Sequence, residues 1–392
     1  MVLFASAVVC FIACHGGPAD HFSTFAETLE AKGYKVEIYA TGPALEKFRG
    51  RKTVTPFVLE NKTEEEVARE LAKKCSSAAV IITDVGHAFD IPLQEALKTE
   101  APNSLRCAYY DNPEPFVPGG YSSVAAKVMR AAQKVFFANG NLAKAPLYQA
   151  PGEEVNLAPE KKIGLGYYPL NQAEEIAKRR IGEQTQLRAH LFSKYSLPDQ
   201  DQKVLVYAGG NNEEYFSKAL PAFLQFLSEA SQEQDLSHLV ILLQQHPGAR
   251  EKNVDGKLVR EWLERQGPEA KVPPFFISAL NSADAQVVAD GMLYYQTSMG
   301  PQFVLAGIPT IIQVGHKTYE DILVRNGLCS TATDAGSLMH AFARLSKDAE
   351  AKSGSEAVMQ GLGINPDWAK RLEDAIRPFV PPVSAAQERS PA

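Results

Sequence analysis

Two stretches of the chain combine glycine, hydroxyl and amide side chains in a way that suits phosphate binding. The first, residues 294–315, reads as a strand, the hydroxyl pair Thr297-Ser298, a short helix and a β-branched strand. A helix N-terminus that follows a strand offers unpaired N–H groups and the positive end of a dipole to an anion. The second, Gly209-Gly210-Asn211, follows another predicted strand, where glycines let the backbone approach a ligand. The sequence therefore predicts a phosphate site; the alternative is an ordinary strand–helix–strand unit whose hydroxyls only cap a helix.

His21 is one of the residues in the first half of the chain that could act as a general base. An unperturbed imidazole has a pKa of about 6.5, so it can take up a proton at neutral pH. Asp84 and Asp111 each end a predicted strand, and the carboxyl ends of parallel strands meet at the edge where α/β sheets bind ligands. Either carboxylate could therefore orient His21 and raise its basicity. His15 and Asp20 compete for the same role, and the structural alternative for His21 is a loop or capping residue.

The elements expected to position these residues alternate between strands and helices along the whole chain. Each half opens with a strand, a Gly-Gly turn and a helix, and a charged helical connector covers residues 170–201. This pattern predicts two facing, doubly wound α/β domains of the Rossmann-like type, residues 1–168 and residues 169–364. Residues 365–392 are expected to form a helix around 366–379 that packs back on the first domain, followed by a tail.

The composition is that of a globular protein with more than one domain. The chain has 392 residues, of which 45% are hydrophobic and 22% charged, and this length exceeds what one core usually holds. The net charge of −6 and the lack of a long Lys/Arg run argue against nucleic-acid binding. The five cysteines are scattered and are expected to be reduced thiols. Residues 2–14 are apolar but lack the basic start of a signal peptide, so they are expected to form a buried strand in a cytoplasmic protein.

Two longer stretches resemble a known family. Residues 16–36, with a Gly-Gly turn, His21 and the run KGYKV, resemble the opening of the N-acetylglucosaminyltransferase of peptidoglycan synthesis. Residues 188–210, which end in a strand and a second Gly-Gly turn, resemble the entry into the donor-binding domain of that enzyme. The chain thus resembles a nucleotide-sugar glycosyltransferase of the two-Rossmann-domain (GT-B) type. This resemblance implies transfer of a sugar, by preference from a UDP-sugar, to an unidentified acceptor hydroxyl in a cleft between the domains.

A second resemblance concerns the donor nucleotide. Bacterial sialyltransferases and polyol-phosphate transferases of the same fold carry a His-Pro pair and a later Ser/Thr pair near the donor phosphate, and His246-Pro247 and Thr297-Ser298 are similar to these pairs. The acidic-acidic-Gly motif of sialyltransferases is missing, so a CMP-sugar is the second choice of donor. Gln302 stands five residues before Gly307, where many relatives have a Glu that binds the ribose, and this departure leaves the nucleotide open.

The resemblance also assigns roles to individual residues. It implies catalysis by His21 with Asp84 or Asp111, without a metal or cofactor, because helix dipoles and His can stabilise a leaving diphosphate. The acidic pair in Asp199-Gln200-Asp201 is interpreted as a solvated turn rather than a metal site. The residues implied in donor binding are Gly16, Gly17, Gly209, Gly210, Asn211, His246, Thr297, Ser298, Met299, Gly300 and Gln302.

Two other functions stay open at this point. A nucleotide-sugar 2-epimerase would use the same fold but needs several carboxylates for acid–base chemistry. A non-catalytic protein that only holds a sugar nucleotide is the second alternative, and the Gln at position 302 favours it. The acceptor, whether glycan, lipid or protein, cannot be read from the sequence because the loops of such folds vary freely. Peripheral membrane association is equally left open.

Overall fold

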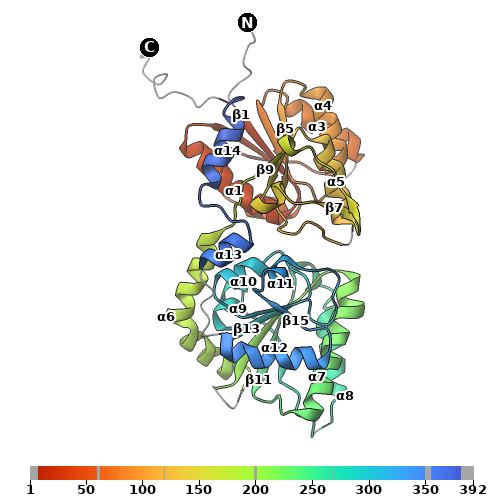
Figure 1. The fold of residues 1–392 in the computed structure, drawn as a ribbon, viewed down its shortest axis with the longest axis vertical. Helices are drawn as coiled ribbons and strands as arrows, with labels where there is room; N and C mark the ends of the chain where they lie inside the picture. The colour runs from red at the N-terminus through yellow and green to blue at the C-terminus, as the bar shows by residue number, and fades with distance from the viewer. Residues whose placement is uncertain are drawn as a thin grey trace. The chain divides into compact units, whose positions relative to one another are not determined.

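A computed structural model describes residues 8–59, 62–118, 120–197, 201–267, 269–348 and 355–380. The chain divides into two compact units (Figure 1): the first comprises Met1–Tyr168 and takes up the chain again at Leu362, and the second comprises Pro169–Gly361. Among the described helices, none is both long and apolar enough to cross a membrane. Asp199, Gln200 and the expected tail beyond residue 380 lie outside the described residues.

The first unit is built on a seven-stranded parallel sheet with the order β3-β2-β1-β4-β5-β6-β9. The order reverses between β1 and β4, which is the point where open α/β sheets bind ligands. The strands are β1 (Val8–Ala13), β2 (Lys35–Ala40), β3 (Val54–Pro56), β4 (Val80–Thr83), β5 (Leu105–Tyr110), β6 (Lys134–Phe137) and β9 (Lys162–Gly164), with a separate hairpin of β7 (Tyr148–Ala150) and β8 (Glu153–Glu154).

Helices cover both faces of this sheet. They are α1 (Gly16–Ala31), α2 (Pro43–Lys47), α3 (Glu64–Lys74), α4 (Asp90–Glu100), α5 (Tyr121–Ala131) and α14 (Trp368–Ile376), with 3₁₀ turns at Gly140–Ala143 and Pro159–Lys161. Strand β1 is buried along its whole length and alternates between two cores: Phe11 packs with α1 and α14, and Ile12 packs with α3 and α4. A strand buried on both sides reads as a continuous apolar run, here VVCFIA.

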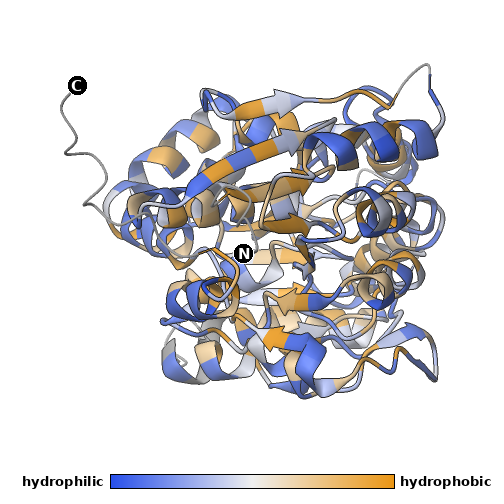
Figure 2. Ribbon diagram, turned by 90° about the horizontal axis from the view of Figure 1, so that it is seen from above, coloured by the Kyte–Doolittle hydropathy of each residue, from blue (hydrophilic) through white to orange (hydrophobic). Residues whose placement is uncertain are grey.

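The second unit repeats the design with a six-stranded parallel sheet in the order β12-β11-β10-β13-β14-β15, which reverses between β10 and β13. The strands are β10 (Lys203–Ala208), β11 (Leu239–Gln244), β12 (Phe275–Ile277), β13 (Gly291–Tyr294), β14 (Thr310–Ile312) and β15 (Ser330–Thr331). Figure 2 shows hydrophobic residues concentrated on the strands and polar ones on the outer helix faces.

The helices of the second unit include one long element. Helix α6 spans 25 residues and packs on α9, where the guanidinium of Arg180 donates to the carbonyls of Gln286 and Ala289 at 2.9 and 2.5 Å. A cation on the last carbonyls of a helix satisfies groups that have no partner inside the helix. The helices are α6 (Leu170–Lys194), α7 (Leu220–Glu233), α8 (Val254–Arg265), α9 (Ser282–Val288), α10 (Gly300–Leu305), α11 (Ile322–Arg325), α12 (Ala335–Asp348) and α13 (Ser355–Gly361), with a π-helical turn at Tyr215–Ala219 and a 3₁₀ turn at Pro247–Ala249.

Three local expectations were wrong. The first Gly-Gly pair is not a turn before a helix, because α1 begins at Gly16 and both glycines form its first turn. Helix α4 was not expected: its N-cap Phe89 makes no side-chain hydrogen bond, so the usual capping signal is missing. The β-branched strand expected at the end of residues 294–315 is only three residues long (β14), since Gln313 has a φ of +51°, which lies outside the strand region.

The predicted return of the C-terminal helix to the first unit is confirmed. Helix α14 buries Leu372 and Ile376 in the core that β1 and α1 share. The ring of Trp368 lies 4.7 Å from that of Tyr167 and 5.2 Å from that of Phe25, between centroids. The apolar face of the helix therefore fills a position in the first unit that the preceding residues leave open.

Three glycines bring this returning segment into backbone contact with the earlier part of the first unit, and a fourth packs on one of them. The N–H of Gly140 donates to the carbonyl of Gly363 at 3.0 Å, and the N–H of Asn365 donates to the carbonyl of Gly166 at 2.7 Å. A Cβ on Gly166 would lie 2.6 Å from the Gly363 oxygen, and a Cβ on Gly164 would lie 2.4 Å from the Gly140 oxygen. Gly166 also has a φ of +70°, which L-residues rarely adopt. Larger residues would therefore separate the segments.

Replacing Gly166 by alanine should destabilise the first unit by about 2 kcal/mol, since left-handed strain is added to an overlap with backbone atoms. Gly152→Ala is the matched control: its φ is +78°, but nothing lies within 4 Å of its Cβ, so only the backbone strain of about 1 kcal/mol applies. The chain has two tryptophans, Trp262 in the second unit and Trp368 in the first. Urea unfolding followed by Trp368 fluorescence in a Trp262→Phe background measures the first unit. Equal losses in both variants would contradict the overlap.

Candidate functional site

Asp84 is the centre of a polar cluster at the carboxyl ends of β1, β4 and β5. It follows β4 directly and is fully buried. Its Oδ2 accepts the backbone N–H groups of Cys14 at 2.9 Å and His15 at 3.0 Å, which follow β1. A buried carboxylate is stable only when such donors replace water. The junction between β1 and α1 is therefore folded around the Asp84 side chain.

His15 presents an imidazole oriented by this carboxylate. Its Nδ1 lies 3.3 Å from Oδ2 of Asp84, and its side chain is 41% exposed. The hydrogen bond to Asp84 raises the pKa of His15, against the opposing effect of burial, and the charges of Asp84 and Asp111 add to the increase. Because Nδ1–H faces the carboxylate, Nε2 is the nitrogen that can exchange a proton with a ligand. A half-exposed imidazole that is hydrogen-bonded to a buried carboxylate can act as a general base.

Asp111 and Tyr121 complete the cluster. Oδ1 of Asp111 accepts the hydroxyl of Tyr121 at 2.9 Å, and burial raises the pKa of Asp111 to about 6. A Cβ on Gly17 would lie 3.0 Å from Oδ2 of Asp111, and one on Gly86 would lie 2.7 Å from the Tyr121 ring and 3.1 Å from the His15 ring. The structure thus brings Gly17, Asp84 and Asp111 together, and His15 is the imidazole that joins them.

His21 lies elsewhere. Its Nδ1 is 2.7 Å from the hydroxyl of Tyr109, and its ring packs edge-on against Tyr167 with 4.8 Å between centroids. Burial lowers its pKa to about 4, which makes it a weak base. The expectation that Asp84 or Asp111 orients His21 was therefore wrong: Asp84 contacts His15 and Asp111 contacts Tyr121. His21 is half-buried and stands one turn before Phe25, which lies on the buried face of α1.

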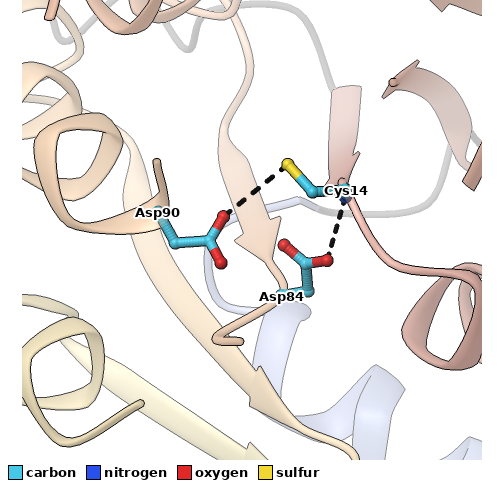
Figure 3. Close-up of side chains that lie close together, drawn as sticks. All are labelled: Cys14, Asp84 and Asp90. Carbon is cyan, nitrogen blue, oxygen red and sulfur yellow. Dashed lines mark hydrogen bonds between the residues drawn. The ribbon is translucent and has the colours of Figure 1, made fainter. Parts of the chain in front are cut away.

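Cys14, Asp84 and Asp90 form the group among the described residues whose atoms could chelate a cation (Figure 3). The three ligand atoms lie within 4.8 Å of one another, and all three side chains are buried. Burial raises the pKa of the Cys14 thiol far above its usual range, so the sulfur keeps its proton. Three atoms are also fewer than the four ligands of a structural zinc site. We assign no metal ligand here.

In the second unit, the glycine turn after β10 packs on Tyr215. A Cβ on Gly210 would lie 2.7 Å from the Tyr215 ring, and one on Gly209 would lie 3.2 Å from its hydroxyl and 3.3 Å from Oδ2 of Asp255. Asp255 is fully buried at the start of α8, and its Oδ1 accepts a hydrogen bond from Nε2 of Gln245 at 2.7 Å. The glycines are therefore required by the protein's own packing, whether or not a ligand approaches them.

The other predicted donor residues follow neighbouring strands. Asn211 follows β10 and His246 follows β11; the imidazole Nδ1 of His246 accepts the N–H of Gly248 at 3.1 Å, and burial lowers the pKa of His246. A Cβ on Gly248 would lie 2.6 Å from Nδ2 of Asn211, so the two turns touch. Thr297 follows β13, which pairs with β10. The strand order thus places the glycine turn between the His-Pro and Thr-Ser pairs.

The turn before α10 is held by its own hydroxyl. Oγ1 of Thr297 accepts the N–H of Met299 at 3.2 Å, while Ser298 is exposed. A Cβ on Gly300 would lie 2.2 Å from the hydroxyl oxygen of Tyr294, so Gly300 is needed for packing. Gln302 is 9% exposed, and its Nε2 lies 3.3 Å from Oε1 of Gln286 on α9. The Gln302 amide is thus hydrogen-bonded to a side chain of the neighbouring helix α9.

Sequence reasoning missed a second imidazole–carboxylate pair. Nε2 of His316, which follows β14, lies 3.1 Å from Oε1 of Glu214, which follows the glycine turn. Lys218 lies 3.4 Å from the same oxygen, and a hydrogen bond from Tyr295 lowers the pKa of Glu214. Both residues could have been found, since each follows a strand end where this fold places ligands. Neither belongs to a recognisable motif, however.

No protein-family model matches the sequence, and no curated protein matches it. Solved structures do. The UDP-GlcNAc 2-epimerase of Neisseria meningitidis, bound to UDP-GlcNAc, matches with a TM-score of 0.64 and 9% identity over 94% of this chain and 99% of its own. The UDP-GlcNAc 2-epimerase of Methanocaldococcus jannaschii matches with a TM-score of 0.63 and 12% identity, over 94% of this chain and 99% of its own. A glycosyltransferase of Rickettsia africae matches with a TM-score of 0.64 and 11% identity, over 96% of this chain and 99% of its own.

The fold is GT-B. The matches extend over nearly the whole chain and so include both α/β units, which confirms the predicted fold class. At identities of 9% to 12% they establish the fold alone, because one fold carries many activities. The function of this GT-B protein has to be argued from its own side chains.

Proposed function

We propose that this protein is a glycosyltransferase that uses a nucleotide sugar, with a UDP-sugar favoured over a CMP-sugar, and His15 as the general base. The observation that carries the proposal is the pairing of His15 with the buried Asp84 at the ligand-binding edge of the first sheet. The proposal assigns acceptor activation to the first unit and donor binding to the second. Similar folds that bind UDP-GlcNAc support the choice of donor class.

Donor binding rests on the row of groups along the carboxyl ends of β11, β10, β13 and β14. Asn211, His246 and the hydroxyls of Thr297 and Ser298 supply donors to phosphate oxygens, and Met299 and Gly300 contribute backbone N–H groups. His316 extends the row, and Glu214 keeps its imidazole oriented. These fixed dipoles would stabilise the charge that develops on the leaving nucleotide, which is the term that matters most in such a reaction.

Acceptor activation uses Nε2 of His15. As the acceptor oxygen attacks the anomeric carbon, its proton moves to Nε2, the bond from the anomeric carbon to the phosphate oxygen breaks, and the nucleotide leaves with the electron pair. Asp84 holds Nδ1–H and stabilises the imidazolium that forms. Gly16 and Gly17 form the first turn of α1 beside this imidazole and leave room for a substrate.

A nucleotide-sugar 2-epimerase is the second candidate. The observation that favours it is the set of three buried or half-buried carboxyl groups in the first unit, Asp84, Asp90 and Asp111, since proton transfer at a sugar carbon needs such groups. Several proteins of similar structure are UDP-GlcNAc 2-epimerases.

One experiment separates these functions. The protein is first screened by thermal shift against UDP-, GDP-, CMP- and ADP-sugars, and the stabilising donor is then incubated in D₂O with an acceptor mixture. A transferase releases free nucleotide and a glycoside, whereas an epimerase leaves the nucleotide sugar intact and incorporates deuterium at C2. Binding without either product would overturn both enzymatic proposals and support a sugar-nucleotide-binding protein.

Replacing Ser298 by leucine should weaken binding of the stabilising nucleotide by about tenfold, the loss expected when one hydrogen bond to a charged group is removed. Ser298 is exposed, so the melting temperature should stay within about one degree. Ser237→Leu is the matched control, because Ser237 is also exposed but precedes β11 at the opposite end of the sheet. Calorimetry measures both affinities. Equal affinity of the Ser298 variant and the wild type would remove this turn from the site.

A further inference from the structure

The carboxyl groups of Asp84 and Asp90 lie side by side in the interior of the first unit, with the sulfur of Cys14 between β1 and α4 (Figure 3). Neither carboxyl group is exposed to solvent, and Cys14 is 3% exposed. Two ionised carboxylates in such a place repel each other strongly, and each loses its hydration. The structure must therefore remove one of the two charges.

The hydrogen bonds show where a proton belongs. Oδ2 of Asp84 accepts two backbone N–H groups and faces the imidazole of His15, while its buried Oδ1 has no hydrogen-bond partner of any kind among the described residues. Oδ2 of Asp90 accepts the N–H of His87 at 2.8 Å, and a carboxyl oxygen of Asp90 lies within 4.8 Å of one of Asp84. Ionised carboxylates only accept hydrogen bonds, so a hydrogen bond between two carboxyl groups requires a proton on one of them.

Asp90 is the better holder of that proton. Asp84 has two N–H donors and an imidazole that stabilise its charge, whereas Asp90 has one N–H donor. The groups that face Asp90 are Asp84 from β4, the neutral thiol of Cys14 at 3.9 Å from β1, and more weakly Glu64 from α3. Burial and the charge of Asp84 hold the pKa of Asp90 well above its usual range.

We propose that Asp90 is a positioning residue that remains protonated at neutral pH and donates its O–H to Oδ1 of Asp84. The Asp84 carboxylate then has a donor on each oxygen and cannot rotate away from His15. This inference rests on the proposed function of His15, but its test needs no substrate. The protonation of Asp90 can therefore be disproved while the proposed function stands, and the proposed function can be disproved while the protonation of Asp90 stands.

Infrared spectroscopy of the full-length protein at pH 8 reads the proton directly. Asp111 and Asp321 have pKa values of about 6, so both are ionised at this pH. We expect a carbonyl band of a protonated carboxyl group that shifts on transfer to D₂O and disappears in Asp90→Asn. Asp111→Asn is the matched control and should keep the band. Its absence in the wild-type protein, or its survival in Asp90→Asn, would overturn the proposal.

The coupling to His15 is tested by NMR titration of its imidazole. Asparagine at position 90 keeps a donor to Asp84 and carries no charge, so the midpoint of His15 should equal that of the wild type. Were Asp90 ionised, the same change would remove a nearby negative charge and lower the midpoint by about one unit or more, which would overturn the proposal. Asp90→Leu fits the space but donates nothing, and the Nδ1–H resonance of His15 should then broaden or vanish. Retention of a sharp resonance in Asp90→Leu would contradict the positioning role.

Discussion

Replacing His15 by alanine should lower turnover with the stabilising nucleotide sugar by about 10²–10⁴-fold, the range that a positioned acid–base group contributes. The affinity for that donor should stay almost unchanged, because His15 belongs to the first unit and the proposed donor residues to the second. Single-turnover kinetics and calorimetry measure the two quantities separately. Turnover within twofold of the wild type would remove His15 from the reaction.

The pH profile distinguishes a base from a structural residue. A base is active when neutral, so turnover should rise with pH through the pKa of His15, which the hydrogen bond to Asp84 holds above 6.5. Asp84→Asn removes the charge that stabilises the imidazolium, so the acidic limb should move to lower pH while the maximum falls. His87→Ala is the control. His87 lies next to His15, with 5.6 Å between ring centroids, but in the part of the chain that the structure describes it makes no hydrogen bond to Asp84.

His21→Gln should make the first unit more resistant to acid. Burial lowers the pKa of His21 from 6.5 to about 4, so the unfolded chain binds this proton more readily than the folded one. The wild type therefore loses stability as the pH falls from 6.5 to 4, and the loss from this residue reaches about 3 kcal/mol at pH 4. Glutamine does not titrate but can still hydrogen-bond Tyr109. The difference in the free energy of unfolding between His21→Gln and wild type should thus change by about 3 kcal/mol, in favour of the variant, between pH 7.5 and pH 4.

The measurement follows Trp368, whose ring contacts Tyr167, the aromatic neighbour of His21. Urea unfolding is recorded at each pH in the Trp262→Phe background, so that only the first unit is observed. His316→Gln is the control, because that imidazole is partly exposed in the second unit. A pH-independent difference between His21→Gln and wild type would show that His21 has the same pKa in the folded and the unfolded chain, and would contradict this prediction.

The sequence predicted the parts of the fold that depend on continuous patterns. A run such as VVCFIA favours a strand that is buried on both faces, and runs of five or six apolar residues located β1, β10 and β11. Helix α4 was missed because the residue before its first turn, Phe89, has no side chain that can cap a helix. The short strand β3 was also missed, because its three residues are too few to form a pattern.

The residues of the site were predicted by their place at strand ends, but their pairing was not. Asp84 and Asp111 follow β4 and β5, and the sequence gives this directly. The choice between His15 and His21 depends on the first residue of α1: a helix that starts at Gly16 leaves His15 at the strand end and turns His21 inward. From sequence alone, the start of a helix is uncertain by several residues. This uncertainty amounts to a whole helical turn, so the sequence could not decide between His15 and His21.

The return of α14 has a consequence for biosynthesis. The first unit is discontinuous in sequence, since the entire second unit lies between β9 and the segment that supplies Leu372 and Ile376 to its core. During translation the second unit is therefore complete while the first still lacks its last helix, and the aromatic surface of Phe25 and Tyr167 stays uncovered. Domains fold as they emerge from the ribosome, in general from the N-terminus. In this chain the unit that begins first should finish last.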